Sequence, residues 1–263
     1  MGKVNIFDFF PLWVIFLCIL IFFLSSVWAG VRIVRRRQSY LGKEDSSIHT
    51  IVAANLALLA FILAFTFNLT TSRFDARKSF LLQEVNAIET AWLRTDLVRG
   101  TQGADIKALL EEYLRIRIVA AENPEKIKET ISRSDAIQKE IWSIVTSLIH
   151  ELPRTDPVDA LFVDAINEMF DIQTSRITAN FTYRIPTTIW IALFVLAMFS
   201  FFSVGYLLGM AKQTNWYIIL MLSLAFTAII MVIIDLDSGK GTIQLNQQPL
   251  YDLYDRLLIK SST

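Results

Sequence analysis

Four long apolar runs organise the chain in two pairs, with a charge-rich stretch between the pairs. The runs extend over Phe9–Val31, Ile48–Leu69, Thr187–Met210 and Trp216–Ile234. Each is close to or above the length of about 20 apolar residues that crosses a bilayer core of about 30 Å. The stretch from Arg73 to Arg184 carries many charged side chains and a helical periodicity. The pattern predicts an all-α membrane protein, with four transmembrane helices and a helical extramembrane domain between spans two and three.

The apolar and charge-rich stretches divide the chain into four segments. Residues 1–72 hold transmembrane helices one and two, 73–186 the extramembrane domain, 187–235 helices three and four, and 236–263 a C-terminal tail. Within the domain, helices are predicted near residues 73–98, 105–121, 124–150 and 157–183. Asn123 before Pro124, and Asp156 before Pro157, match the N-cap and first position of a helix. Sustained period-two alternation is missing, so no strand is predicted.

The cluster of basic residues near the first run lies after it, which favours a membrane anchor over a cleaved signal peptide. They are Arg32, Arg35, Arg36, Arg37 and Lys43. The positive-inside tendency therefore places the loop between spans one and two in the cytoplasm. A second basic group flanks the opposite ends of the spans and favours the reverse orientation, so the side on which the domain lies stays open. This second group is Arg73, Arg77, Lys78, Arg176 and Arg184.

Composition narrows the class further. The chain is 54% hydrophobic, with a formal net charge of zero and a mean hydropathy of +0.46, which is more apolar than a typical soluble domain. The zero net charge gives no reason to expect nucleic acid as a partner. The single cysteine, Cys18, cannot form a disulfide within the chain, and the only histidines, His49 and His150, lie far apart. We find no catalytic or cofactor motif, and therefore predict a protein that is neither an enzyme nor a cofactor carrier.

The helix after span two has two contrasting faces. One is an apolar seam of Leu81, Val85, Ile88 and Trp92; the other is a polar, uncharged stripe of Ser79, Gln83, Asn86 and Thr90. The stripe either packs on another polar helix or lines a wet passage, because a fully solvated face usually carries Lys and Glu.

The same helix is predicted to continue without a break from span two. Neither Gly nor Pro occurs between Ile48 and Arg99. At about 100° per residue, one side of such a rod collects the candidate pore-lining residues, which are Phe61, Phe65, Asn68, Ser72, Asp75, Ser79 and Asn86.

These residues predict an ion channel made of several copies, because one helix encloses nothing. Phe61 and Phe65 would form an apolar gate, although lipid-facing or core positions explain them equally well. Asp75 would form a ring that favours cations, unless it pairs with Arg77 or Lys78 of a neighbouring helix. The alternative function is a membrane-anchored helical sensor or scaffold whose domain binds a ligand or partner.

Two carboxylates end the last span, at Asp235 and Asp237. A negative charge at a helix C-terminus costs about 0.3–1 kcal/mol, so a partner of positive charge is expected. The first hypothesis is a solvated pair neutralised by arginine, and the second is a cation site; whether a metal binds is left open.

Two segments resemble the bestrophin-like family of bacterial membrane proteins. One is Arg73-Phe-Asp-Ala-Arg77 followed by Glu84-Val-Asn86-Ala-Ile-Glu-Thr90-Ala-Trp-Leu-Arg94. The other is Asp235-Leu-Asp237 with Gly241 and Gln248-Pro249-Leu250. The resemblance implies a multi-pass channel of the bacterial inner membrane, assembled as a homo-oligomer, by resemblance a pentamer. Its partners would be the lipid bilayer and inorganic ions.

In bestrophins, span two lines a hydrophobic neck, and most members pass anions. An acidic calcium-binding cluster follows their last span, and Asp235 and Asp237 are similar to it in position. The resemblance therefore supports the gate proposed at Phe61 and Phe65, while it opposes the cation preference inferred from Asp75.

Overall fold

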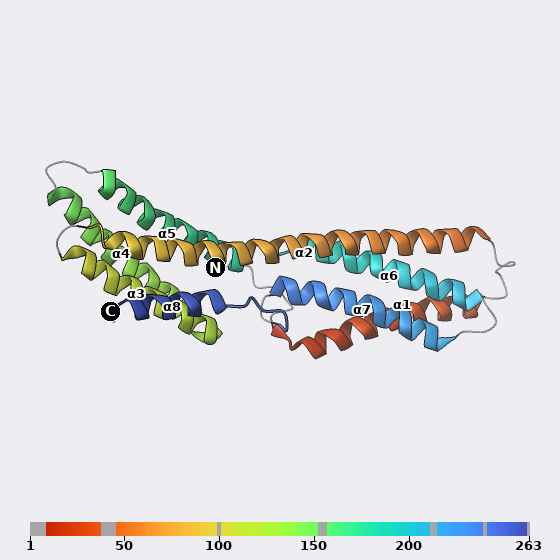
Figure 1. Ribbon diagram of the computed structural model, residues 1–263. Coiled ribbons are helices and arrows are strands. Elements are labelled where there is room, and N and C mark those ends of the chain that lie inside the picture. The colour runs from red at the N-terminus through yellow and green to blue at the C-terminus, as the bar shows by residue number, and fades with distance from the viewer. Residues whose placement is uncertain are drawn as a thin grey trace. The chain divides into compact units, whose positions relative to one another are not determined.

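The computed structural model describes residues 9–37, 46–98, 101–151, 157–210, 215–238 and 241–261. These residues form helices throughout and contain no strand, as predicted. In chain order (Figure 1) the elements are α1 (Leu12–Arg37), α2 (Ser46–Thr95), α3 (Gln102–Glu122), the 3₁₀ turn η2 (Pro124–Lys126), α4 (Ile127–Glu151), α5 (Pro157–Phe181), α6 (Thr187–Met210), α7 (Trp216–Ser238) and α8 (Gln248–Ser261). The sites predicted at Lys43 and Asp156 lie outside the described residues.

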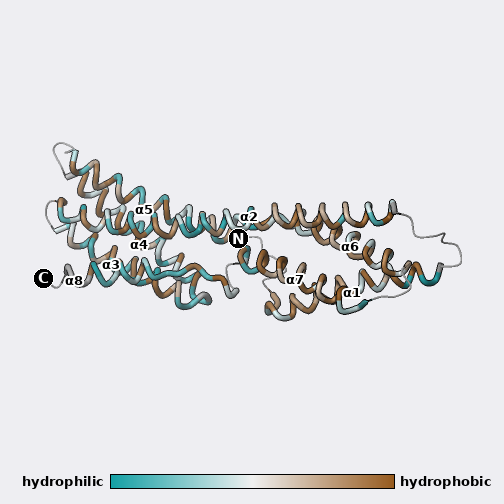
Figure 2. Tube along the Cα trace, turned by 45° about the vertical axis from the view of Figure 1, so that its right-hand side comes forward, coloured by the Kyte–Doolittle hydropathy of each residue, from teal (hydrophilic) through white to brown (hydrophobic). Residues whose placement is uncertain are grey.

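The chain divides into two compact units. The first unit comprises residues 1–75 and 181–244, and the second comprises residues 76–180 and 245–263. Helices α1, α6 and α7 of the first unit are mostly hydrophobic, whereas hydrophilic positions are frequent along the helices of the second (Figure 2). Among the described residues, four helices, α1, α2, α6 and α7, are long and apolar enough to cross a membrane, in agreement with the predicted spans.

Close backbone contact between α1 and α6 holds the first unit together. A Cβ atom added at Gly30 would lie only 2.7 Å from the backbone nitrogen of Tyr206, and one at Gly205 would overlap the backbone of Val27. Nearby, the rings of Phe23 and Phe201 stack with their centroids 4.2 Å apart. Small residues that allow such an approach are typical of helix interfaces in membranes, where van der Waals contact replaces the hydrophobic effect as the driving force.

Several polar side chains of α2 and α6 find partners inside the first unit. The hydroxyls of Thr66 and Thr70 each donate to the carbonyl one turn earlier in α2, at 2.7 Å. Asn55 of α2 donates to the Ser203 hydroxyl of α6 at 3.3 Å, and its carbonyl accepts a hydrogen bond from Ser200 at 3.2 Å. An unpaired polar group in hydrocarbon costs several kcal/mol, so these bonds make the polar residues compatible with a bilayer.

Helix α2 runs without interruption from Ser46 to Thr95, which confirms the predicted rod. No break occurs between Leu69 and Asp75, where the apolar part of the helix ends. The helix ends slightly before the predicted Val98, because residues 96–98 form turns. One helix thus belongs to both units, its first part to the first unit and its second part to the second.

The second unit has its own hydrophobic core. The seam predicted from the sequence is buried, with Leu81, Val85, Ile88 and Trp92 between 0% and 4% exposed. The core also contains side chains of α3, α4 and α5, and three leucines of α8: Leu250, Leu253 and Leu257.

Helix α8 is a feature that the expected tail at residues 236–263 does not include. Its signal is the spacing of three and four between Leu250, Leu253 and Leu257, which places them on one face of a helix. The segment is too short for that spacing to stand out from sequence alone, yet its leucines are as buried as any in the core.

We expect Leu253→Ala to destabilise the protein by about 2–5 kcal/mol, because it leaves a cavity in the core of the second unit. Asp255→Ala on the exposed side of α8 is the matched control. Thermal unfolding in detergent should separate the two variants clearly. Equal stability of both variants would show that α8 contributes nothing to this core.

Candidate functional site

The candidate pore-lining residues of α2 are all exposed in the single chain. Phe61 is 67% exposed and Phe65 is 57% exposed, although both belong to an apolar helix. The other members of this set, which we call the front stripe, are Asn68, Ser72, Asp75, Ser79 and Asn86, and each is also exposed.

The opposite side of α2 is buried along its length. Leu59, Leu63, Thr66 and Thr70 are buried in the first unit, and the apolar seam is buried in the second. The front stripe therefore stays on the uncovered side of the helix from Phe61 to Asn86, as the 100° periodicity predicts. One further member was missed: Leu82 is 43% exposed and falls between Ser79 and Asn86.

A charged contact joins α2 to the end of α7 within the first unit. Asp237 is buried, and its Oδ1 accepts a hydrogen bond from the backbone N–H of Ile185 at 3.1 Å. Arg73 of α2 approaches the same oxygen, with Nη1 at 3.8 Å. Arg73 therefore supplies the positive charge expected opposite this carboxylate.

Asp235 lies two residues earlier in α7. It binds the backbone of the segment that follows this helix. Its carboxylate accepts hydrogen bonds from the backbone N–H groups of Thr242, at 2.9 Å, and Ile243, at 3.1 Å. Gly241 lies directly against this carboxylate, and any side chain there would overlap Oδ1 of Asp235. The close approach of Asp235 therefore explains sterically why position 241 is a glycine, which is one of the residues shared with the bestrophin-like family.

The acidic pair differs from the sequence expectation in one respect. Asp235 and Asp237 are only 7% and 6% exposed, so the expectation of a solvated pair was wrong. Backbone N–H groups bind the carboxylate oxygens that a calcium ion would need as ligands. Among the described residues, no group of three or more His, Cys, Asp or Glu side chains gathers where a metal could bind. This geometry fits a structural ion pair better than a calcium site.

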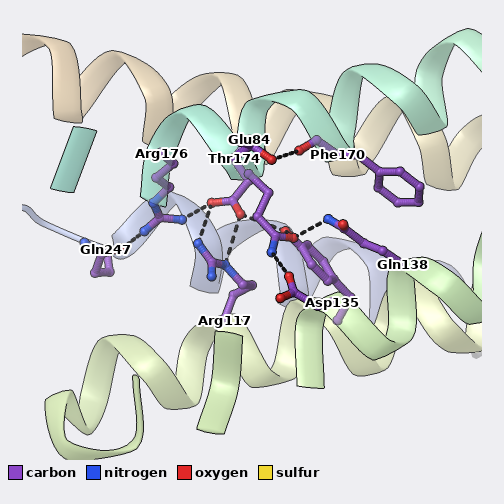
Figure 3. A network of polar contacts seen from close by, with 10 residues as sticks. Glu84, Arg117, Asp135, Gln138, Phe170, Thr174, Arg176 and Gln247 are labelled. Atoms are coloured by element: carbon purple, nitrogen blue, oxygen red, sulfur yellow. Dashed lines mark hydrogen bonds and ion pairs between the residues drawn. The ribbon is translucent and has the colours of Figure 1, made fainter. Parts of the chain in front are cut away.

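A second charged cluster, which we call the Glu84 hub, lies in the core of the second unit (Figure 3). Glu84 of α2 is fully buried. Its Oε2 contacts Arg176 of α5, and its Oε1 lies 3.0 Å from Nε of Arg117 of α3. The hydroxyl of Tyr113 donates to Oε1 at 2.9 Å. Both carboxylate oxygens thus have partners, and one negative charge faces two positive ones.

The hub extends to the remaining helices of the second unit. The Tyr113 hydroxyl lies 2.7 Å from Oε1 of Gln173 in α5, and that oxygen also accepts a hydrogen bond from Gln138 of α4. Arg176 donates a second hydrogen bond, of 2.9 Å, to Oε1 of Gln247, just before α8. Side chains of α3 and α5 thus contact the Glu84 carboxylate directly, and Gln138 and Gln247 join the network through Gln173 and Arg176.

Glu84 lies in the part of α2 that follows the apolar span. The charges of the hub determine whether its carboxyl group is ionised. Burial by itself raises the pKa of this carboxyl, but the positive charges of Arg117 and Arg176 and the hydrogen bonds outweigh burial, so the pKa is lower than usual. Burial, and next the negative charge of Glu84, raise the pKa of Tyr113 well above its ordinary value. At neutral pH the hub therefore holds a carboxylate and a neutral phenol.

The role of Glu84 was not predicted from the sequence, where this residue appears only as part of a segment that resembles the bestrophin-like family. Its position was the available signal, because Glu84 lies next to Val85 and three residues after Leu81, on a face that is otherwise apolar. A lone acid in an apolar seam requires buried positive partners.

Comparison with known proteins identifies the class. A family model described as Bestrophin-like domain matches residues 17–250, and the chain belongs to the bestrophin-like family. Its fold is similar to crystal structures of variants of a bacterial bestrophin homolog from Klebsiella pneumoniae. Two such variants have TM-scores of 0.69 and 0.66 at 12% and 14% identity, over 93% of this chain and 98% and 99% of theirs. The chain therefore has a bestrophin-type channel fold. No curated protein sequence matches it.

We expect replacement of Asp235 and Asp237 by Asn to lower the apparent melting temperature in detergent by about 3–8 °C, because charge-assisted hydrogen bonds are lost. Asp164→Asn, at an exposed position of α5, is the control. Added calcium should leave the wild type unchanged. If calcium stabilises the wild type and not the double variant, the pair is a cation site; if neither replacement nor calcium has an effect, both hypotheses fail.

Proposed function

We propose that this protein is an oligomeric ion channel in which α2 lines the pore. The observation that supports the proposal is the front stripe, which stays uncovered along one helix whose other side is buried in both units. Phe61 and Phe65 are uncovered within the apolar part of α2, and Ser79 and Asn86 are uncovered beyond it. Several copies around an axis would bring the stripes together into an enclosed path.

The two parts of the stripe suit different tasks. Large apolar side chains can narrow a pore enough to exclude water, so rings of Phe61 and Phe65 would act as a gate. Beyond them, Asn68 and Ser72 would lie at the end of span two, and Ser79 and Asn86 would line a polar vestibule outside the bilayer. Asp75 is the charged member of the stripe. The function is transport of inorganic ions and not catalysis.

The proposed number of copies and location rest on the resemblance to the family. A homo-pentamer in the bacterial inner membrane, with each chain crossing the bilayer several times, is the assembly we propose. Measurement of the detergent-solubilised mass tests this assembly directly, since a stable monomer would have no enclosed pore. Purified protein that is oligomeric but does not conduct in liposomes would favour the membrane-anchored sensor or scaffold instead.

We expect Phe61→Ala to raise the basal ion flux of purified protein in liposomes, because a smaller ring would let water wet the gate. Phe199→Ala on α6 is the matched control, since Phe199 is also exposed, at 55%, but lies on another helix. An unchanged flux in a folded Phe61→Ala protein, with measurable wild-type flux, would indicate that Phe61 contacts lipid or a neighbouring helix.

Asp75 provides a test of selectivity. A ring of carboxylates raises the local concentration of cations and repels anions, so we expect the wild type to prefer cations and Asp75→Asn to reduce that preference. Reversal potentials under a salt gradient give the ion selectivity of the wild type and of Asp75→Asn. Asp164→Asn is the control for loss of an exposed acidic residue, here in the second unit. A wild type that prefers chloride, or a cation preference that survives the replacement, would exclude Asp75 as the selectivity element.

A further inference from the structure

The Glu84 hub is more polar than the stability of its surroundings requires. The core around it consists of aliphatic and aromatic side chains from the same helices, including Leu81, Val85 and Ile88. Replacement of a buried ion pair by apolar residues of similar volume often leaves a protein equally stable or more stable, because desolvation offsets the attraction between the charges. Stability alone therefore gives no reason for three ionised side chains in this core.

Directionality distinguishes the hub from the apolar seam. Apolar contacts are non-directional, so Leu81, Val85 and Ile88 could pack acceptably in several rotations of α2. The carboxylate of Glu84 instead meets Arg176 at one oxygen and both Arg117 Nε and the Tyr113 hydroxyl at the other. These partners come from α3 and α5, and they accept only one orientation of the helix that carries Glu84.

Helical geometry relates this orientation to the front stripe. At about 100° per residue, Glu84 lies about 140° from Ser79 and about 160° from Asn86 around the axis of α2. A rotation of α2 that moved Ser79 or Asn86 away from the uncovered side would also pull the carboxylate of Glu84 away from its arginines. Within the second unit, the hub and the stripe residues Ser79 and Asn86 are thus fixed to one another by the helix itself.

We propose that Glu84 is a positioning residue that sets the rotation of the extramembrane part of α2, and with it the side chains presented along the vestibule. Buried polar groups that fix the register of packed helices are the best-attested use of such a group. The proposal rests on the proposed function only for its effect on conduction, since the rotation of the helix can be measured without any current.

The principal variant removes all three charges together: Glu84→Leu, Arg117→Leu and Arg176→Met. Its matched control is Glu112→Gln with Arg133→Gln, which removes another ion pair of the second unit, between α3 and α4. Rotation is measured in a Cys18→Ala background, where single cysteines introduced by Ser79→Cys or by Val85→Cys react with a polar thiol reagent. Ser79 is exposed and Val85 is 4% exposed, so the wild-type hub should give a large reactivity ratio.

In the charge-free variant we expect the Ser79-to-Val85 reactivity ratio to fall by about tenfold, because α2 samples other rotations once the hub is gone. Its melting temperature should stay close to the wild-type value, and the control pair should keep the wild-type ratio. Reversal potential and conductance should change with the ratio. A conducting wild type whose folded charge-free variant keeps both the ratio and the conductance would overturn the proposal.

Tyr113→Phe is the second variant, for use if the charge-free protein does not fold. It removes one hydrogen bond to Glu84 and keeps the aromatic ring, and we expect a smaller fall of the same ratio. An unchanged ratio in Tyr113→Phe, when the charge-free protein cannot be obtained, also counts against the proposal. If the ratio falls as expected but the wild type conducts no ions, the positioning role stands and the channel function fails.

Discussion

The unbroken backbone of α2 is the constraint on which the rest of this structure depends. Because the helix contains neither Gly nor Pro from Ser46 to Thr95, every side chain along it has a fixed angle relative to every other. The front stripe persists for this reason, and it needs no contact of its own to remain aligned.

Charged contacts hold this helix in each unit, and those of Arg73 and Glu84 lie on its buried side. Arg73 meets Asp237 at the end of α7, and Glu84 meets Arg117 and Arg176 in the core of the second unit. Arg73 and Glu84 are separated by 11 positions, which corresponds to nearly whole turns of an α-helix. Within each unit, the charged contact thus lies on the side of α2 away from the front-stripe residues of that unit.

Hydrophobic patterning was sufficient to predict the helices, the four spans, the continuous rod and the buried seam, because each depends on many residues at once. The front stripe could also be located, since a 100° period needs only the sequence; its role as a pore lining remains a prediction. The Glu84 hub could not be assembled in advance, because Arg117 and Arg176 are separated from Glu84 by 33 and 92 positions. The burial of Asp235 and Asp237 was missed because their partners are backbone N–H groups of residues 185, 242 and 243, and a backbone partner leaves no residue type to recognise.

The position of α8 has a consequence for how the protein is made. Leu250, Leu253 and Leu257 belong to the same core as Leu81 and Ile106, yet they are synthesised after α6 and α7. The second unit therefore cannot complete its core on the ribosome while the last two apolar helices are still entering the translocon. Until α8 emerges, α3, α4 and α5 must wait with part of their apolar surface uncovered, where chaperones and proteases can reach it. Synthesis of α8 is thus the event that ends this vulnerable period, so a quality-control system that senses this surface would also detect a product that lacks α8.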